Sequence, residues 1–487
     1  MVEVVLLSIY GLLLFFILLY SFVQLNLSLA YRNEMKEEKQ RPKADGIDWP
    51  HVTIQLPVYN ELYVVERLID CVAELDYPSD KLEIQVLDDG NDESVQKAQS
   101  RVAHWQSKGL DIKHIQREER VGYKAGALAY GLEKAKGEFT AIFDADFLPS
   151  KDFLKRTIPH FIGNDQLGVV QTRWEHINED YSTLTRLQAF GLDAHFTVEQ
   201  TGRNRQGHFI NFNGTAGVWR NACIHDAGGW QHDTITEDLD LSYRAQLKGW
   251  KFRYLEEVGS PAELPAEMNA LKSQQFRWTK GAAECAVKNL PKVLMKRGIG
   301  LPTKIHAIFH LMNSAVFVCI LAAALLSLPI LMVKASTSAY DIWFNVAGVF
   351  LISFFVLAFF YWTSRKYRGD RFIDFLRDFP LFLSVSMGLS LHNSIAVIEG
   401  YIGRKTPFVR TPKFAIADTK SSWTDKKYRA LKANPITVVE ALLSIYFIFA
   451  VGLGIYFLEF GLMPFHVMLA VGFGYVAWYS FKHTRVS

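Results

Sequence analysis

Long apolar runs at both ends of the chain constrain its fold more than any other feature. Five runs, at residues 4–30, 305–333, 342–362, 438–458 and 462–479, are long and apolar enough to cross a bilayer. They explain why 49% of the 487 residues are hydrophobic. Residues between 31 and 304 have the composition of a soluble domain. We therefore expect a multi-pass membrane protein with an N-terminal anchor at 1–31, a soluble domain at 50–290 and a membrane region at 300–487.

The distribution of positive charge predicts the orientation of these spans. Basic residues follow the first run closely, which indicates that the soluble domain is cytoplasmic. The loops at 365–377 and 404–432 are also basic, so we expect them on the same side. The segment between them, about 376–401, contains Pro380, His392 and Asn393 and favours an interfacial helix over a span. This gives five spans in a bacterial-type inner or plasma membrane, with the N-terminus outside and the C-terminus inside.

Strands and helices alternate in the soluble part. Strands are predicted at 52–56, 82–88, 111–118 and 139–146, the first of them ended by Pro57. Such alternation predicts an open, mostly parallel α/β sheet. In such sheets ligands bind beyond the carboxyl ends of the strands. No G-x-G-x-x-G follows the first strand, so the dinucleotide-binding fingerprint is absent.

The apolar run at 139–143 ends in two carboxylates, Asp144 and Asp146. Buried unpaired carboxylates are costly, so these should lie at the end of a strand. A turn with solvated acids would explain an isolated Asp-x-Asp equally well. Here the pair ends a buried strand, which favours Mg²⁺ or Mn²⁺ bound by both carboxylates together with the phosphates of a nucleotide.

A second acidic group opens a predicted helix. Glu237, Asp238 and Asp240 follow Thr236, a plausible N-cap. Acids at a helix start also interact favourably with the helix dipole, so their position alone does not establish a catalytic role. A sugar transfer needs a general base for the acceptor hydroxyl, and Asp238 is our candidate.

A third group contains Arg277, Trp278 and Lys124. Arg277 can give charge-assisted hydrogen bonds to phosphate oxygens. Trp278 offers a flat face for a sugar ring, and Lys124 is a candidate phosphate or nucleobase contact. A surface arginine, a core tryptophan and a solvated lysine are the structural alternatives.

Together these motifs resemble the processive family 2 glycosyltransferases. "DDG" at 88–90, "DAD" at 144–146, "TED" at 236–238 and "QQFRW" at 274–278 occur in the order of that family's D, DxD, TED and QxxRW motifs. The segments "VGYKAGAL", "FNGTAGVWR" and "TEDLDLSYRA" are similar in sequence to the cellulose synthase catalytic subunit and, more closely, to the cellulose-synthase-like mannan synthases. The resemblance is dense over residues 52–287 and looser beyond. It implies a GT-A-like nucleotide-sugar transferase domain inserted between transmembrane helices.

The resemblance also implies roles for particular residues. Nucleotide-sugar contacts would come from one set of side chains (Tyr59, Glu61, Asp89, Lys124, Asp144, Gln274 and Arg277). Metal would bind Asp144 and Asp146, and Asp238 would be the catalytic base beside Glu237. The acceptor would meet Trp278 and the stretch Asn213, Gly214 and Thr215, which stands where cellulose synthases have a cysteine. A loop similar to the family's gating loop would use Phe408, Thr411 and Lys413, with Arg410 in place of the usual valine.

The expected function is an inverting, metal-dependent hexosyltransferase. It would move a hexose from UDP-glucose or GDP-mannose onto a growing β-linked polysaccharide and couple this to translocation. A glycolipid-forming transferase that adds one or a few sugars to a lipid remains open. A third possibility is an inactive transferase-like transporter or scaffold, although the spans carry almost no charge and every acid is present. The expected partners are the nucleotide sugar, a glycan or lipid acceptor and the lipid bilayer, with no nucleic acid.

Overall fold

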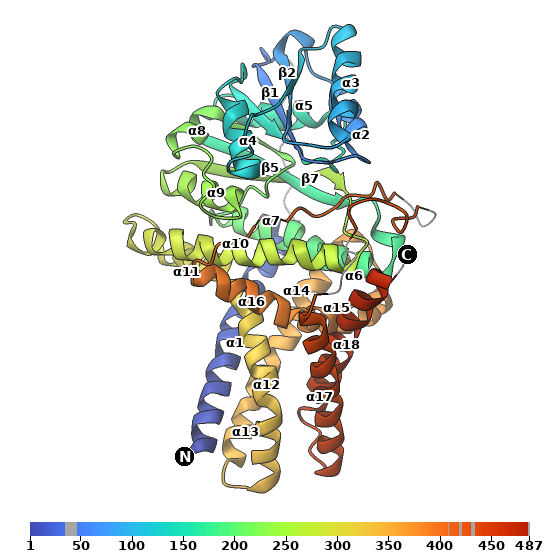
Figure 1. The fold of residues 1–487 in the computed structure, drawn as a ribbon. Coiled ribbons are helices and arrows are strands. Elements are labelled where there is room, and N and C mark those ends of the chain that lie inside the picture. Colours follow the sequence, from blue (N-terminus) through green and yellow to red (C-terminus); the bar gives the residue numbers. More distant parts are fainter. Residues whose placement is uncertain (35–45, 408, 418–420, 430–433, 486–487) are drawn as a thin grey trace.

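The protein has two parts in the computed structural model, which describes residues 1–34, 46–407, 409–417, 421–429 and 434–485. A sheet domain stands above a tapering group of long helices (Figure 1). The N-terminus lies at the end of helix α1 far from the sheet domain, and the C-terminus lies near the junction of the two parts. The expected soluble domain flanked by apolar helices is therefore present.

The sheet domain is built on seven strands in the order β3-β2-β1-β4-β6-β5-β7. The first four positions are parallel, β6 is antiparallel to both neighbours, and β5 and β7 are parallel. The predicted open α/β sheet is confirmed, and the antiparallel strand was not foreseen. The strand bounds are β1 Val52–Val58, β2 Leu82–Asp88, β3 Ile112–Ile115, β4 Phe139–Ile142, β5 Leu167–His176, β6 Gly217–Arg220 and β7 Lys251–Ala262.

Helices cover both faces of this sheet, which explains why its strands read as continuous apolar runs. One core packs Ile54, Val86 and Phe143 together, and a second packs Leu128 with Trp219. The covering helices are α2 Val65–Ala73, α3 Ser94–Ser107, α4 Tyr123–Leu132, α5 Phe153–Thr157, α6 Thr183–Ala194, α7 Gln200–Arg205, α8 Asn221–Asp226 and α9 Glu237–Leu247. Shorter turns lie at Ser79–Lys81, Ile158–Phe161 and Glu179–Tyr181 (3₁₀) and at His195–Glu199 (π).

The prediction that Pro57 ends the first strand is wrong. Pro57 pairs with Leu87 of β2, and β1 continues to Val58. The carbonyl of Gln55 accepts from Phe143 N on the β4 side at 3.2 Å, so Pro57, two residues on, faces the same side. β4 has already ended at Ile142, and the missing N–H of the proline removes no ladder hydrogen bond there.

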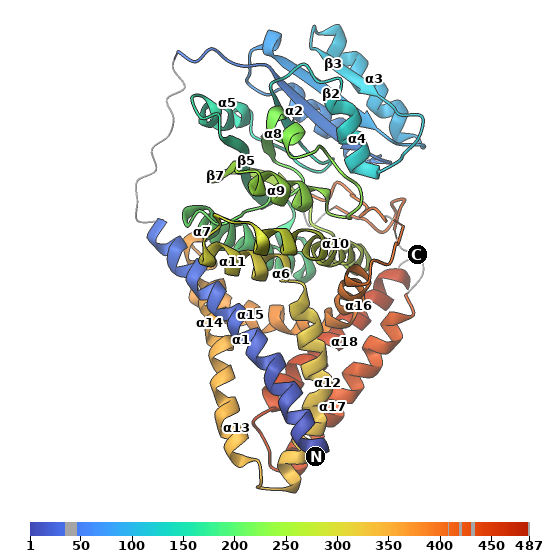
Figure 2. The same ribbon diagram turned by 90° about the vertical axis from the view of Figure 1, so that its left-hand side faces the viewer.

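Four helices in the described ranges are long and apolar enough to span a membrane. Three of them are single helices: α1 Val2–Glu34, α12 Ala315–Ser336 and α17 Ile436–Tyr456. The fourth is the continuous helical stretch Asp341–Arg368, which consists of α13 Asp341–Ala347, the 3₁₀ turn Gly348–Leu351 and α14 Ile352–Arg368. Figure 2 shows α1 running alongside α12 and α14, against which it packs. Four of the five predicted spans are thus present as apolar helices, although the second begins at residue 315, after the separate helix α11 Leu301–Leu311.

Two predictions about the membrane part need correction. The run at 462–479 lies in α18 Met463–Arg485, which is not among the candidate spans, since polar residues such as His466 and Ser480 dilute its apolar ones. The single interfacial helix is two helices, α15 Phe372–Gly388 and α16 Ser390–Tyr401, bent by 50°. At the bend Gly388 lies so close to Gly472 of α18 that an added Cβ would be 2.2 Å from a carbonyl oxygen. If the bent pair counts as one span, the described helices supply five.

The long helix α10 Met268–Met295 joins the two parts. It packs against α9 of the sheet domain on one side and against α16 and α11 on the other. In Figure 1 it crosses above the upright helices. The motif residues 274–278 therefore lie at the boundary between the sheet domain and the membrane part.

Candidate active site

One cavity beyond the carboxyl ends of β1, β2 and β4 collects almost every predicted site residue. Its lining includes 15 of them: Tyr59, Glu61, Asp89, Lys124, Asp144, Asp146, Asn213, Gly214, Glu237, Asp238, Gln274, Arg277, Trp278, Thr411 and Lys413. Phe408 lies outside the described residues. Thr215 is fully buried and does not line the cavity. Segments separated by up to 354 residues in sequence, from Tyr59 to Lys413, thus meet in one place.

The two acids of the Asp-x-Asp motif are each paired with a lysine. Lys124 Nζ lies 2.5 Å from Asp144 Oδ1 and donates to the carbonyl of Gly214 at 2.8 Å. Lys413 Nζ donates to Asp146 Oδ2 at 2.7 Å. Burial lowers the pKa of Lys124, but Asp144, Glu237 and Asp238 outweigh it and hold that pKa above its ordinary value. Both carboxylates therefore face a cation inside the cavity.

This arrangement fits a hard divalent cation. The Asp144 side chain is about one-third exposed in the cavity, and the buried Asp146, two residues further on, already has the Lys413 ammonium at one oxygen. Among the described residues no cluster of three or more His, Cys, Asp or Glu could hold a metal alone. Mg²⁺ and Mn²⁺ accept one or two carboxylates and complete their shell with phosphate oxygens and water. The donor's phosphates would have to supply the remaining ligands.

The predicted base, Asp238, lies next to Gly214 and Lys124. Gly214 has φ +81°, and an added Cβ there would be 3.0 Å from Asp238 Oδ2 and 3.4 Å from Lys124 Nζ. Burial raises the pKa of Asp238 to about 6, although Lys124 opposes the shift. Burial and the neighbouring Asp238 raise the pKa of Glu237 to about 7. A carboxylate with a pKa near 6 suits proton transfer near neutral pH.

The helix that carries this pair begins as predicted, but its cap differs. Thr236 occupies the N-cap position of α9 without a capping hydrogen bond from its side chain. Its Oγ1 instead lies 3.4 Å from Cys285 Sγ in α10. Asp240 is fully buried and accepts from Arg244 and Asn289. Asp240 therefore has a structural role and is not part of the cavity.

The "FNGT" stretch fixes the backbone of Asp144 and lines the cavity. Thr215 Oγ1 accepts from Asp144 N at 2.9 Å, so its expected contact with the acceptor is replaced by a role in fixing the Asp144 backbone. Asn213 lines the cavity and accepts from Gln200 at 2.6 Å. Its amide nitrogen lies 3.1 Å from His195 Nε2. Asn213 is therefore fixed by neighbouring polar groups.

The side of the cavity that was predicted to bind the nucleotide contains an aromatic and charged group. Arg120 stacks on Tyr59 with its guanidinium carbon 3.4 Å from the ring centre. The side chain of Asp89 is 7% exposed and accepts from Arg117 Nε at 2.9 Å. Arg120 was not predicted, and only its position after a predicted strand could have indicated it. Stacking and charge of this kind can hold a nucleobase and ribose.

The loop after α16 reaches into the cavity from the membrane part. Arg410 Nη1 lies 2.7 Å from Glu61 Oε1. Burial raises the pKa of Glu61 to about 7, while Arg410 opposes the shift. Arg277 donates to the carbonyl of Val409 at 2.6 Å and to Thr411 Oγ1 at 2.7 Å. Burial lowers the pKa of Arg277 to about 10 despite Asp144 and Glu237. The loop thus contacts the same residues that were predicted to bind the donor.

Trp278 is not a core residue. It is half-buried, lines the cavity and lies 6.4 Å from Trp174, ring centre to ring centre. The sequence analysis missed Trp174, His176 and Glu263 as cavity residues, and it noted Arg410 only as a departure within the gating-like loop. Trp174 and His176 are two residues apart at the end of a partly apolar stretch, which was the available signal. Glu263 carried none.

Comparison with known proteins agrees with this geometry. The family description "Glycosyltransferase like family 2" matches residues 50–281. Glucomannan 4-beta-mannosyltransferase 9 of Arabidopsis thaliana is 42% identical over 287 residues, 57% of this chain and 54% of that protein. Glucomannan 4-beta-mannosyltransferase 1 of Oryza sativa subsp. japonica is 43% identical over 273 residues, 55% and 52% of the two chains. The chain spans about half the length of the curated relatives that it matches.

A solved structure shares the fold. The mannosyltransferase PcManGT from Pyrobaculum calidifontis, in complex with GDP-Man and Mn²⁺, aligns with a TM-score of 0.56 at 19% identity, covering 82% of this chain and 100% of that one. Residues 50–281 therefore form a glycosyltransferase family 2 domain with a GT-A-like fold, similar to the cellulose-synthase-like mannosyltransferases.

Proposed function

We propose that this protein is an inverting, metal-dependent mannosyltransferase that extends a β-linked polysaccharide. The observation that carries the proposal is the cavity in which Asp238, the Asp144–Lys124 pair and Trp278 meet. A base, a diphosphate site and an aromatic surface for a sugar are the three parts that such a transfer needs. All three come from different elements, so their meeting is not a property of one motif.

The reaction is a single displacement at the anomeric carbon. Asp238 accepts the proton of the acceptor hydroxyl while that oxygen bonds to the anomeric carbon. The bond from that carbon to the phosphate oxygen breaks, and the nucleoside diphosphate leaves. Lys124 and Arg277 stabilise the charge that develops on the leaving diphosphate. Mg²⁺ or Mn²⁺ held by Asp144 and Asp146 would neutralise the rest of that charge.

GDP-mannose is the proposed donor. The relatives in Arabidopsis thaliana and Oryza sativa subsp. japonica are named as glucomannan mannosyltransferases, and PcManGT was solved with GDP-Man and Mn²⁺. The acceptor is proposed to be the free end of a β-linked glycan. A glycolipid-forming enzyme would use the same chemistry with a product of few sugars, so product size distinguishes the two. An inactive scaffold is disfavoured because the acids and both lysines are all in the cavity.

The membrane part is proposed to hold the sheet domain on the cytoplasmic side of a plasma or inner membrane. Within the described residues, the segments that carry the basic loops (365–377, 404–407, 409–417 and 421–429) and the end of α18 lie toward that domain, while the N-terminus lies at the far end of α1 (Figure 1). This agrees with an outside N-terminus and an inside C-terminus. It also leaves α10 and Trp278 next to the bilayer, where a growing polymer could enter it.

The test uses the full-length protein in lipid nanodiscs with radiolabelled GDP-mannose or UDP-glucose. We expect Mn²⁺ or Mg²⁺ to support incorporation from GDP-mannose into a polymer that an endo-β-mannanase digests, and EDTA to abolish it. Asp238→Asn is the control for chemistry by a contaminant. Incorporation from neither donor, or only into a small lipid-soluble product, would contradict the proposal.

A further inference from the structure

The segment that joins α10 to α11 carries unbalanced positive charge. Residues 287–305, called the basic corner below, contain five lysines and arginines and no carboxylate. One of the five, Lys288, is ion-paired with the sheet domain. Lys292, Lys296 and Arg297 are exposed, and no carboxylate of the described residues forms an ion pair with them. The basic corner therefore has cations that a partner outside the described chain could balance.

The basic corner lies at the depth of lipid headgroups. Residues 4–23 of α1 are 20 predominantly apolar residues, which span about 30 Å as a helix and match the hydrocarbon thickness of a bilayer. Asn26 follows this stretch, and its Oδ1 lies 3.1 Å from His306 Nε2 of α11. Figure 2 shows α11 at the upper end of the long helices, next to α1. The helix α11 and the turn before it therefore lie where the hydrocarbon ends on the side of the sheet domain.

Apolar side chains of the basic corner are exposed beside these cations. Leu294 and Met295, in the last turn of α10, are 43% and 73% exposed. Leu301 and Ile305, one turn apart on α11, are 69% and 39% exposed. An apolar face bordered by lysine and arginine is typical of helices that lie in the interface of an anionic membrane. The composition of the basic corner thus fits its depth.

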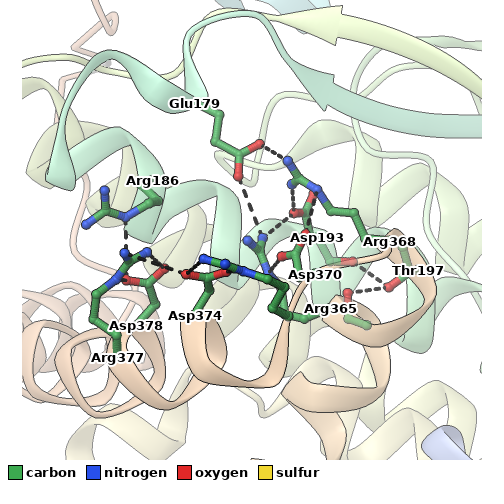
Figure 3. Close-up of polar contacts among 12 residues, drawn as sticks. Glu179, Arg186, Asp193, Thr197, Arg365, Arg368, Asp370, Asp374, Arg377 and Asp378 are labelled. Atoms are coloured by element: carbon green, nitrogen blue, oxygen red, sulfur yellow. Dashed lines mark hydrogen bonds and ion pairs between the residues drawn. The ribbon is translucent and has the colours of Figure 1, made fainter.

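The corner between α14 and α15 shows that depth alone does not require unbalanced charge. It too exposes apolar side chains, among them Phe372 and Ile373. Its arginines, however, meet carboxylates of the same corner or of the sheet domain, as Figure 3 shows. The pairs are Arg365 with Asp193, Arg368 with Asp193 and Glu179, Arg371 with Asp374, and Arg377 with Asp378. The unmatched cations of the basic corner are therefore a property of that corner and not of every segment at this depth.

We propose that the basic corner binds anionic phospholipids of the leaflet on the side of the sheet domain. Phosphate oxygens of the headgroups accept charge-assisted hydrogen bonds from its unmatched cations, and its exposed apolar side chains reach the first methylene groups of the acyl chains. An anionic bilayer provides both the negative charge and the apolar region at this depth, whereas an acidic protein or free phosphate provides only the charge. The bound lipid holds the C-terminal end of α10, the helix that carries Arg277 and Trp278, on the membrane surface.

The test measures lipid contact at the basic corner itself. Full-length protein with Met295→Cys is labelled with bimane in nanodiscs, after Cys71→Ser and Cys319→Ser remove the two half-buried thiols. Quenching is compared in mixtures of phosphatidylglycerol and phosphatidylcholine in which one lipid or the other, at equal mole fraction, is brominated. At low salt we expect phosphatidylglycerol to be preferred about tenfold or more, because each basic residue beside an anionic surface contributes about fivefold. In about 1 M NaCl the Debye length falls to about 3 Å, and the preference should disappear.

Two triple variants of equal charge separate the basic corner from the net charge of the protein. In Lys292→Gln/Lys296→Gln/Arg297→Gln the two lipids should quench nearly equally, with the fold retained by circular dichroism. The control removes three exposed lysines of the sheet domain and should keep the wild-type preference (Lys108→Gln/Lys134→Gln/Lys251→Gln). Equal quenching by both lipids in the wild type, no quenching by either, or a preference that persists in the first variant would each overturn the proposal. Because the measurement reports lipid contact and not sugar transfer, each of these results would leave the proposed function standing.

Discussion

Gly214 provides a quantitative test of the active-site geometry. Its φ of +81° is a left-handed conformation that costs a non-glycine residue about 1–2 kcal/mol. In Gly214→Ala the new Cβ would lie 3.0 Å from Asp238 Oδ2, closer than an ordinary carbon–oxygen contact. The carboxylate must then move by a few tenths of an ångström. The substitution should therefore lower the free energy of unfolding, because the backbone is strained, and lower the rate of transfer, because the Asp238 carboxylate is displaced.

The structure offers a control for the backbone part. Gly163 has φ +69°, is exposed, and has nothing within 4 Å of an added Cβ. Gly163→Ala should lose the same 1–2 kcal/mol of unfolding free energy and keep its activity. A misplacement of about 1 Å can cost about 10²-fold in rate, so the smaller shift in Gly214→Ala should cost on the order of tenfold in kcat.

The assay compares the two variants side by side. Thermal melts give the stability loss, and initial rates of sugar transfer at saturating donor give kcat. We expect similar falls in melting temperature and a lower kcat in Gly214→Ala alone. If Gly214→Ala transfers sugar as fast as Gly163→Ala, the Cβ does not displace the base, and the assignment of Asp238 loses its geometric support.

Three further substitutions test separate parts of the site. Asp238→Asn should lower the rate of transfer by about 10²- to 10⁴-fold and leave nucleotide binding intact. Because a protonated carboxyl cannot accept a proton, the wild-type rate should also fall as the pH drops through about 6. A rate that does not change with pH in this range would contradict the assignment of the base. Asp146→Ala should remove the Mn²⁺ dependence of GDP binding in calorimetry, and an equal metal effect in the variant would show that Asp146 is not a ligand. Trp278→Ala should shorten or abolish the polymer while GDP-mannose still binds; a folded variant that makes full-length product would refute the acceptor role.

The sheet could be predicted in its first half and not in its second. Four strands with helices between them were visible as apolar runs that end in polar residues, because a parallel sheet buries both faces. The antiparallel β6, Gly217–Arg220, is four residues long, and its place between β4 and β5 depends on pairing across 75 residues of chain. The prediction that Pro57 ends the first strand failed for a related reason. A proline is tolerated in a strand where the neighbouring strand has already ended, and the pairing of β4 with β1 stops at Gln55.

The membrane part shows the same limit. Apolar length identified α1, α12, α14 and α17, because spans must be both long and apolar. The bend between α15 and α16 lies where Gly388 meets Gly472 of α18, a contact that no local pattern reveals. Sequence therefore predicts an element well where its cause is local, and poorly where a distant element decides its course.

The site follows this rule as well. Motifs identified most of the carboxylates in the cavity, since each of these follows a strand or opens a helix there, but they missed Glu263. They did not identify which cation each carboxylate meets. Asp146 meets Lys413, 267 residues away in sequence, and Glu61 meets Arg410 from the same loop. The loop between α16 and α17 thus supplies two of the charges that balance acids of the cavity. Any ligand that adds negative phosphate and a divalent cation to this site must therefore rearrange that loop's contacts, and the loop and the donor cannot bind these acids independently of each other.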